Sequence, residues 1–211
     1  MKIYSQPYSR RTHRLSITLA RENDRFRLKV ETLKDAPGTL YRLCAVLFRH
    51  DWDIQSAEIC SHVQDHQVID EFVVRPLVDV ADLVDEIKFE AMMTDFEKLL
   101  FEELEVNQYL AKHPLPQPAT GATSPASVQV QYENDGARTY LILSGPDCPG
   151  LLLMITGVFA GHDVDLLEAH IETSEDQSVR NRFLVNPTDQ RFADPEFRES
   201  LARAIARATA R

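Results

Sequence analysis

Two short stretches of the chain carry residues that could hold a small charged molecule. Residues 33–40 read Leu-Lys-Asp-Ala-Pro-Gly-Thr-Leu, and residues 145–152 read Gly-Pro-Asp-Cys-Pro-Gly-Leu-Leu. A helix that begins at such a turn presents unpaired N–H groups and the positive end of its dipole, which attract an anion such as an α-carboxylate. Gly38 and Gly150 lack a Cβ, so a ligand could reach the backbone there, and the preceding prolines would hold each turn rigid. The alternative is a helix start that binds nothing.

Four aspartates accompany these turns. Asp35 and Asp147 lie two residues before the turn prolines, and Asp53 and Asp165 follow the two turn glycines at equal distance, where the next strand should start. Asp35 and Asp147 could each accept a charge-assisted hydrogen bond from an α-amino group, or could each be the N-cap of the helix. A carboxylate cannot donate a hydrogen bond to a ligand carboxylate, so the four residues favour contact with an amine or a side-chain amide.

The second stretch belongs to an internal copy of the first. Besides the two turns, the matching segments are His50-Asp51 with His162-Asp163, Asp53-Ile54 with Asp165-Leu166, Phe72-Val73-Val74 with Phe183-Leu184-Val185, and Glu22-Asn23-Asp24 with Glu133-Asn134-Asp135. So many agreements of residue type and order predict a duplication. We expect one domain at 12–111, a second at 128–211, and between them a Pro-, Ala-, Thr- and Ser-rich linker at 112–127.

Each copy should contain two strand pairs. In the first copy, alternating apolar residues predict strands at 14–21, 26–30, 54–62 and 67–74. The polar segment 22–25, and its counterpart 133–136, have the turn residues of an antiparallel hairpin. The predicted order ββαββα lacks the last strand of a ferredoxin-like βαββαβ unit, and we expect the first hairpin strand to take its place at the sheet edge.

Two helices complete the copy. The first should start within 35–38, with an Asp cap and an early proline, and end near His50. The second should cover about 82–103, and its apolar face should hold Leu83, Ile87, Phe96, Leu99 and Leu100. The counterpart of the second helix is expected at 195–208.

The string Asp-x-Pro-Gly-x-Leu, an Asp-Ile or Asp-Leu pair at the next strand, Ala-x-Ile and a Phe-x-Val strand occur in both copies, and together they resemble the ACT domain. More narrowly, they are similar to the paired C-terminal ACT domains of the bacterial PII uridylyltransferase family, whose ACT pair is thought to sense glutamine. That family usually has Arg where this chain has Ala36 and Cys148. The resemblance implies an α+β fold of two ferredoxin-like (ACT) α/β sandwiches in tandem, each with an antiparallel four-stranded sheet.

The resemblance also implies a function: regulatory, allosteric binding of an amino acid, glutamine being one option, in nitrogen metabolism and without catalysis. In similar serine-binding ACT domains, asparagines hold the ligand at the slots of the four aspartates. The expected ligand-binding residues are Asp35, Pro37, Gly38, Thr39, Asp53, Ile54, Asp147, Pro149, Gly150, Leu151, Asp165 and Leu166. The alternative is a ligand-independent dimerisation or protein-interaction module. We expect a small-molecule amino acid as partner, with a homodimer as one arrangement.

Composition narrows the classes of partner. A formal net charge of −10 argues against nucleic acid and anionic membranes, because phosphate binding uses Lys and Arg. The basic cluster Arg10, Arg11, His13 and Arg14 should be a solvated tail, or else a docking patch. Three cysteines without paired spacing, with no signal-like or membrane-spanning apolar run, predict a cytoplasmic protein with reduced thiols.

Other reactive residues are given structural interpretations. The His-Asp dipeptides at 50–51 and 162–163 resemble those of metal-dependent phosphohydrolases, but they fall on turns without further ligands at metal spacing. The group Cys60, His62, Asp65 and His66 is not repeated in the second copy and is interpreted as a solvated turn. Cys148 could be a redox thiol or a small packed residue. The sequence thus predicts no catalytic residue, no metal and no cofactor.

Overall fold

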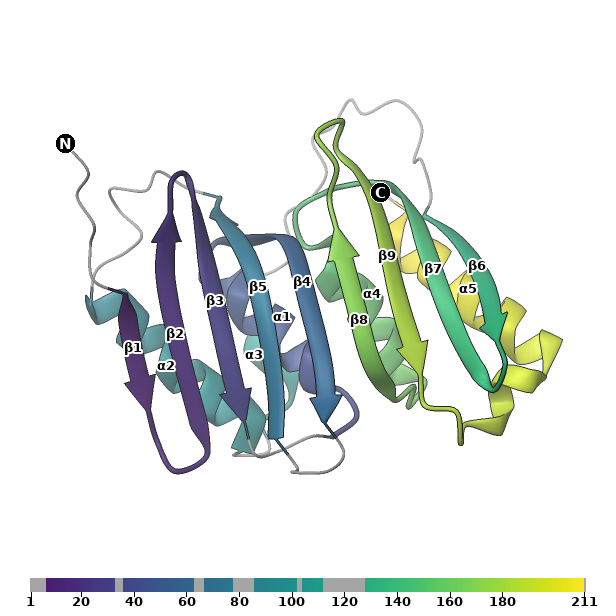
Figure 1. Cartoon of the computed structure of the whole chain (residues 1–211), viewed down its shortest axis with the longest axis horizontal. Helices are drawn as coiled ribbons and strands as arrows, with labels where there is room; N and C mark the ends of the chain where they lie inside the picture. Colours follow the sequence, from purple (N-terminus) through teal and green to yellow (C-terminus); the bar gives the residue numbers. More distant parts are fainter. Residues whose placement is uncertain are drawn as a thin grey trace.

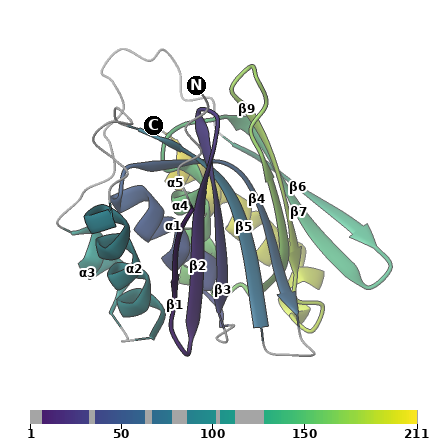
Figure 2. The same cartoon turned by 60° about the vertical axis from the view of Figure 1, so that its left-hand side comes forward.

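The computed structural model describes residues 7–32, 36–62, 67–77, 86–101, 104–111 and 128–210 (Figure 1). These residues form a mixed α/β structure in which one antiparallel sheet is covered on one face by helices (Figures 1 and 2). The strands are β1 (Tyr8–Arg11), β2 (Leu15–Glu22), β3 (Arg25–Thr32), β4 (Trp52–His62), β5 (Gln67–Pro76), β6 (Gln129–Asp135), β7 (Arg138–Pro146), β8 (Leu166–Glu172) and β9 (Ser178–Val185). The helices are α1 (Thr39–Arg49), α2 (Glu86–Phe101), α3 (Val106–Leu110), α4 (Leu151–Gly161) and α5 (Pro195–Thr209), with a 3₁₀ turn η2 (Gln190–Ala193).

The nine described strands are ordered β1-β2-β3-β5-β4-β8-β9-β7-β6. The first half contributes β2-β3-β5-β4 and the second half contributes β8-β9-β7-β6, while β1 adds an edge strand that we did not predict. The expectation of two separate four-stranded sheets needs correction, because β4 and β8 pair antiparallel and join the halves, with Ala57 opposite Ile171 and Ile59 opposite Ala169. This pairing satisfies the backbone groups that two edge strands would otherwise expose.

Both predicted hairpins are present. β2 pairs antiparallel with β3, and β6 with β7, so the first strand of each half lies where we expected it in the sheet order. The proposed match of Glu22-Asn23-Asp24 with Glu133-Asn134-Asp135 is wrong by two residues. Asn23 and Gly136 are the residues that take positive φ in the two turns. The two hairpins are therefore equivalent at these two residues, and the similar polar sequence Glu-Asn-Asp lies at different positions in them.

Helices α1 and α4 begin one residue after the turn glycines. Gly38 and Gly150 are the N-caps, with φ of 83° and 80°, and no described side chain caps either helix. The interpretation of Asp147 as an N-cap is therefore wrong, and the early proline lies before the helix instead of in its first turn. Asp35 lies outside the described residues. The end of α1 is as predicted, since His50 is its C-cap.

Helix α2 faces the core differently from the prediction. Its buried residues are Phe89, Met92, Met93, Phe96, Leu99 and Leu100. Ile87, which we placed on this face, is 80% exposed. Residues two apart on a helix lie on nearly opposite sides, so burial of Phe89 turns Ile87 toward solvent. Leu83 lies outside the described residues, and α5 agrees with the predicted range 195–208.

Part of the N-terminal basic cluster contacts the chain itself. Arg10 on β1 forms an ion pair with Glu90 and a longer one, at 4.0 Å, with Glu97, both on α2. The guanidinium of Arg14 lies 4.9 Å from the centre of the Phe101 ring. The prediction of a solvated tail or docking patch is therefore wrong for Arg10, which connects the edge strand to α2, whereas Arg14 is exposed and lies over the Phe101 ring.

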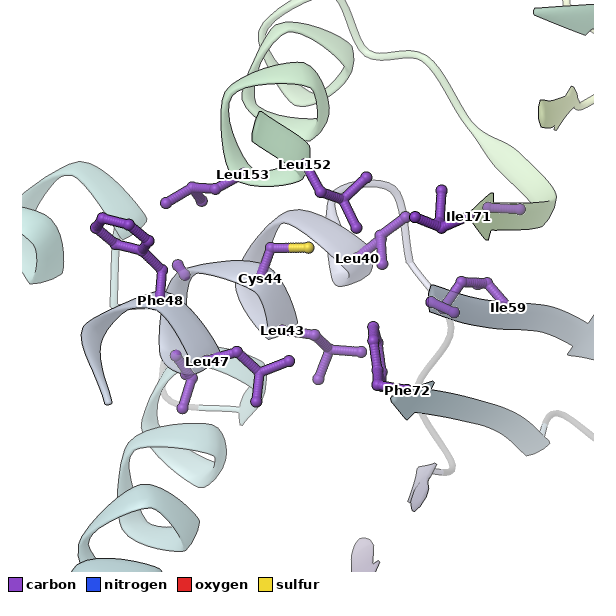
Figure 3. Close-up of a cluster of buried hydrophobic side chains, with 14 of the residues drawn as sticks. Leu40, Leu43, Cys44, Leu47, Phe48, Ile59, Phe72, Leu152, Leu153 and Ile171 are labelled. Atoms are coloured by element: carbon purple, nitrogen blue, oxygen red, sulfur yellow. The ribbon is translucent and has the colours of Figure 1, made fainter. Parts of the chain in front are cut away.

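The core is continuous from one half to the other (Figure 3). Leu40 and Cys44 of α1 face Leu152 of α4 and Ile171 of β8 across the junction. The predicted linker 112–127 lies outside the described residues. None of the described helices has the length and apolar content needed to cross a membrane.

Candidate ligand-binding site

Of the cavities that residues of both halves line, two contain a buried polar side chain from a central strand. We name them after the polar residue that each holds on a central strand. The Asn181 cavity is lined by Cys44, Phe48, Trp52, Asp53 and Ile54 from the first half and by Asp147, Cys148, Gly150, Leu151, Leu152, Leu153, Ile171, Thr173, Val179 and Asn181 from the second. The Asp70 cavity is lined by Ala36, Pro37, Gly38, Thr39, Leu40, Tyr41, Ile59, Val68 and Asp70 from the first half and by Thr156, Phe159, Ala160, Val164, Asp165 and Leu166 from the second.

Each cavity joins the glycine turn of one half to the start of a strand pair in the other. Asp53 and Ile54 meet the turn at Gly150, whereas Asp165 and Leu166 meet the turn at Gly38. The α1 and α4 helices, which both begin at these turns, pack against each other in the middle. The sequence predicted these residues as ligand contacts but did not indicate that the residues lining one cavity come from opposite halves. Of the predicted residues, Pro149 does not line the Asn181 cavity, and Asp35 lies outside the described part of the chain.

Two carboxylates face the Asn181 cavity from opposite halves. Asp53 is 6% exposed and accepts hydrogen bonds from Gln55 Nε2 at 2.7 Å and Arg75 Nη2 at 3.0 Å, both on its Oδ2. Burial raises the pKa of Asp53, and the bonds from Arg75 and Gln55 offset part of that rise. Asp147 accepts a hydrogen bond from the Thr173 hydroxyl at 3.2 Å. Burial, and next the negative charge of Asp53, raise the pKa of Asp147 to about 6.

Asn181 adds a hydrogen-bond donor to this cavity. The residue is 1% exposed and lies on β9, where its Oδ1 accepts a bond from the backbone N–H of Glu172 at 3.3 Å. No group in the described part of the chain accepts a hydrogen bond from its Nδ2. The cavity thus carries two acceptors that can be negatively charged and one amide donor.

The Asp70 cavity has the same plan with different polar groups. Asp70 on β5 is 1% exposed and occupies the place of Asn181, since it lies opposite Val30 as Asn181 lies opposite Leu143. Asp165 accepts a hydrogen bond from Asn186 Nδ2 at 2.8 Å. The donor to Asp165 is thus an amide, whereas Asp53 accepts from the guanidinium of Arg75. This cavity also has two carboxylates among its described lining residues, Asp70 and Asp165, but no amide side chain.

Sequence reasoning missed Asp70 and Asn181, although a signal was present. In β5 the inward residues Val68, Phe72 and Val74 alternate with outward ones, and Asp70 occupies an inward position. Asn181 interrupts the β9 alternation at the equivalent position. A polar residue on the buried face of a strand requires a partner, and its repetition in both copies is more informative than either occurrence.

The backbone of the turns supplies further donors. The first helical N–H groups are used inside the turns, because Thr39 N donates to Ala36 O and Leu151 N to Cys148 O, both at 3.0 Å. Leu152 and Leu153 line the Asn181 cavity, and their backbone N–H groups donate to no carbonyl of the described residues. They are the groups that a ligand acceptor could reach.

Both cavities are small in this conformation. The Asn181 cavity measures about 20 Å³ and the Asp70 cavity about 30 Å³, room for roughly one water molecule each. At Gly38, Arg42 Nη1 lies 3.0 Å and Ala160 Cβ 3.7 Å from the position that a Cβ would take, so side chains already cover this turn. An amino acid would therefore have to widen either cavity.

The other reactive residues have structural partners. His50 Nε2 lies 3.0 Å from Asp95 Oδ2, and His162 Nδ1 lies 2.9 Å from the Val158 carbonyl oxygen, so both histidines fasten helix ends. Burial raises the pKa of the Cys44 thiol to about 12, which keeps it protonated at neutral pH. Among described residues no group of three or more His, Cys, Asp or Glu could hold a metal ion. Of the predicted turn group Cys60, His62, Asp65 and His66, the side chain of His62 and the residues Asp65 and His66 lie outside the described part of the structure.

The described residues therefore define an α/β protein with one antiparallel sheet and two cavities at the junction of its halves. Part of the chain is similar to bifunctional uridylyltransferase/uridylyl-removing enzymes. It is 39% identical over 79 residues to that of Pseudomonas fluorescens (strain SBW25) and 36% identical over 81 residues to that of Ectopseudomonas mendocina (strain ymp). These matches cover 36% and 37% of this chain but only 9% of each enzyme.

No protein-family model matches the chain. Among solved structures, an unknown protein from Galdieria sulphuraria aligns with 89% of this chain and 92% of its own, at 14% identity and a TM-score of 0.27.

Proposed function

We propose that this chain is a regulatory protein that binds an amino acid between two ACT-type halves and catalyses no reaction. The observation that carries the proposal is the meeting of Asp53 from one half with Asp147 and the Gly150 turn from the other in a single cavity. A ligand held by both halves stabilises the packing that accommodates it relative to any other. Such a coupling between binding and conformation typically amounts to ~1–3 kcal/mol.

The sheet order supports the ACT-type assignment. In a ferredoxin-like sheet the strand that leads into the first helix has the last strand as its outer neighbour. Here β3 leads into α1 and its outer neighbour is β2, and β7 likewise has β6. The N-terminal hairpin strand thus replaces the missing last strand in both halves, in keeping with the duplicated sequence pattern. The partial similarity to uridylyltransferases gives additional support, and a role in nitrogen metabolism with glutamine as ligand is part of this proposal.

The groups at the Asn181 cavity suit a zwitterion. An ammonium group would lie between the carboxylates of Asp53 and Asp147 and relieve their repulsion. A carboxylate or amide carbonyl would accept from Asn181 and from the N–H groups at the start of α4. Opening of the small cavity on binding would carry the signal from the ligand to the packing of α1 against α4.

The test is a thermal-shift and calorimetric screen of the purified chain with the twenty common amino acids, L-glutamine first. We expect one of them to raise the melting temperature, because a ligand that binds the native state stabilises it. Asp53→Ala with Asp147→Ala should abolish the shift, whereas Asp24→Ala, in the exposed β2–β3 turn, should retain it. If no amino acid produces heat or a shift, the proposal is wrong.

A second candidate function is a ligand-independent module for dimerisation or docking onto another protein. It is favoured by one observation, the room for only about one water molecule in each cavity. Light scattering separates the two functions, since a module of this kind should keep its oligomeric state when Asp53 and Asp147 are both replaced by Ala and when amino acids are added.

A further inference from the structure

The two cavities differ at one equivalent position. Asn181 and Asp70 both lie on the strand next to the junction strand of their half, face the core, and are 1% exposed. One is an amide with two N–H donors, and the other is an acid whose ionised form only accepts. The two cavities therefore occupy equivalent places in the two halves, but their polar groups differ.

Asn181 is oriented for a ligand acceptor. Its Oδ1 is occupied by the N–H of Glu172, which directs Nδ2 away from that strand, and the side chain lines the cavity. No described group accepts from Nδ2. This N–H group can therefore donate a hydrogen bond to an incoming carboxylate or carbonyl oxygen.

At the position where the Asn181 cavity has an amide donor, the Asp70 cavity has a carboxyl group. A ligand placed as in the Asn181 cavity, with its ammonium near Asp165, would bring its carboxylate against the carboxylate of Asp70. The ionised form of Asp70 would repel a ligand carboxylate strongly at close range in a buried site. The Asp70 cavity therefore disfavours the ligand end that the Asn181 cavity favours.

We propose that only the Asn181 cavity binds a zwitterionic amino acid, so that the duplicated chain takes one such ligand and not two. This inference rests on the proposed function and sharpens it. Both halves have a glycine turn at the junction. The cavity with Asn181 on its central strand binds the zwitterion, and the cavity with Asp70 at the equivalent position does not.

Isothermal titration calorimetry measures the stoichiometry directly. The probe is L-glutamine, followed by the other common amino acids, titrated into the full chain. We expect one molecule per chain for the wild type. Asn181→Asp should weaken binding at least tenfold, and Asp70→Asn should raise the stoichiometry to two by giving the second cavity the missing donor.

Each variant has a folding control. Asn181→Asp places an acid in the second half where the first half already holds Asp70, and circular dichroism melting checks that it folds. If it does not, Asn181→Ala, which removes the donor without adding charge, should show the same loss. The stoichiometries of the wild type and of Asp70→Asn do not depend on that variant.

Three results would overturn the inference. Two equal sites in the wild type, unchanged affinity in a folded Asn181 variant, or a single site in Asp70→Asn would each contradict it while leaving the proposed function intact. Absence of heat with every amino acid would overturn the proposed function as well.

Discussion

Asp53 and Asp147 line the same cavity although they come from different copies of the duplicated sequence. Among the described residues, Arg75 bonds to Asp53 at 3.0 Å and Thr173 bonds to Asp147 at 3.2 Å, so the guanidinium offsets the charge of Asp53 more directly than that of Asp147. The negative charge of Asp53 contributes to the raised pKa of Asp147. The two carboxylates therefore repel each other, and protonation of one of them or binding of a cationic group reduces this repulsion.

Protonation of Asp147 should stabilise the fold. Its pKa is about 6 in the folded chain and about 3.9 when unfolded, so the folded state binds the proton more tightly. This stabilising contribution is complete below about pH 4 and is lost as the pH rises through about 6. Between pH 7 and pH 5 we expect a gain of at most about 1 kcal/mol in the free energy of unfolding, after allowance for solvent screening.

Urea denaturation at pH 5, 6, 7 and 8 measures this gain. Asp147→Asn should reduce it and should stabilise the chain at pH 7, because the amide carries no charge in the cavity. Asp24→Asn, on an exposed turn, serves as the control and should keep the wild-type pH profile. Equal profiles for the wild type and Asp147→Asn would show that Asp147 is not the responsible group.

Ligand affinity should have the opposite pH dependence. An ammonium group binds the ionised form of Asp147, so the dissociation constant of an amino acid such as L-glutamine should rise several-fold as the pH falls from 7 to 5. Calorimetric titration at the two pH values tests this, because the α-amino and α-carboxyl groups of free glutamine keep their charges over that range. Tighter binding at pH 5 would contradict the assignment of Asp147 to the ammonium group.

Tyr109 on α3 should stabilise the helical layer through Asp95. Its hydroxyl donates to Asp95 Oδ2 at 2.8 Å, and the same oxygen is 3.0 Å from His50 Nε2. Tyr109→Phe should cost about 1 kcal/mol, since it leaves a partly buried carboxylate with one partner fewer. Tyr41→Phe is the control, because its hydroxyl makes only a 3.4 Å bond to Asn107, and it should cost less. Chemical denaturation of both variants gives the comparison.

Gly157 permits the close approach of α4 to α1. A Cβ at this position would lie 3.1 Å from Tyr41 Cε2, whereas a Cβ at Gly161 in the same helix would meet nothing within 4 Å. Alanine favours a helix over glycine, so Gly161→Ala should be neutral or stabilising by up to about 1 kcal/mol. Gly157→Ala should be less favourable than Gly161→Ala by about 1 kcal/mol, because the Tyr41 ring must move. Thermal denaturation of the two variants measures the difference.

The features predicted correctly from the sequence are those that local residue patterns determine, namely strands, hairpin turns and helix ends. Alternation located the strands of the first half except β1, the turn residues located both hairpins, and the last helical residues of α1 were found to within one position. The error at Ile87 arose because several apolar residues in α2 allow two competing faces, and packing on the sheet selects the one that contains Phe89.

Contacts between the copies could not be predicted in the same way. The pairing of β4 with β8 depends on two strand edges that are distant in sequence, and no local periodicity encodes it. For that reason Asp53 and Asp147 were predicted as ligand contacts without the prediction that they line the same cavity. Asn181 could have been found, because it is a polar residue at an inward position of an otherwise apolar strand.

The left-handed conformation of Gly150 provides a last prediction that separates stability from binding. Gly150 has φ of 80° and lines the Asn181 cavity, while Gly136 has φ of 60° in the β6–β7 turn with open space around it. Alanine is strained in this region, so each Gly→Ala change should cost about 1–2 kcal/mol of stability. Only Gly150→Ala also adds a methyl group beside the ligand and alters the turn that starts α4. In the same calorimetric titration, Gly136→Ala should keep the wild-type amino-acid affinity and Gly150→Ala should lose it, and equal affinities in two equally destabilised variants would show that the ligand does not touch the turn.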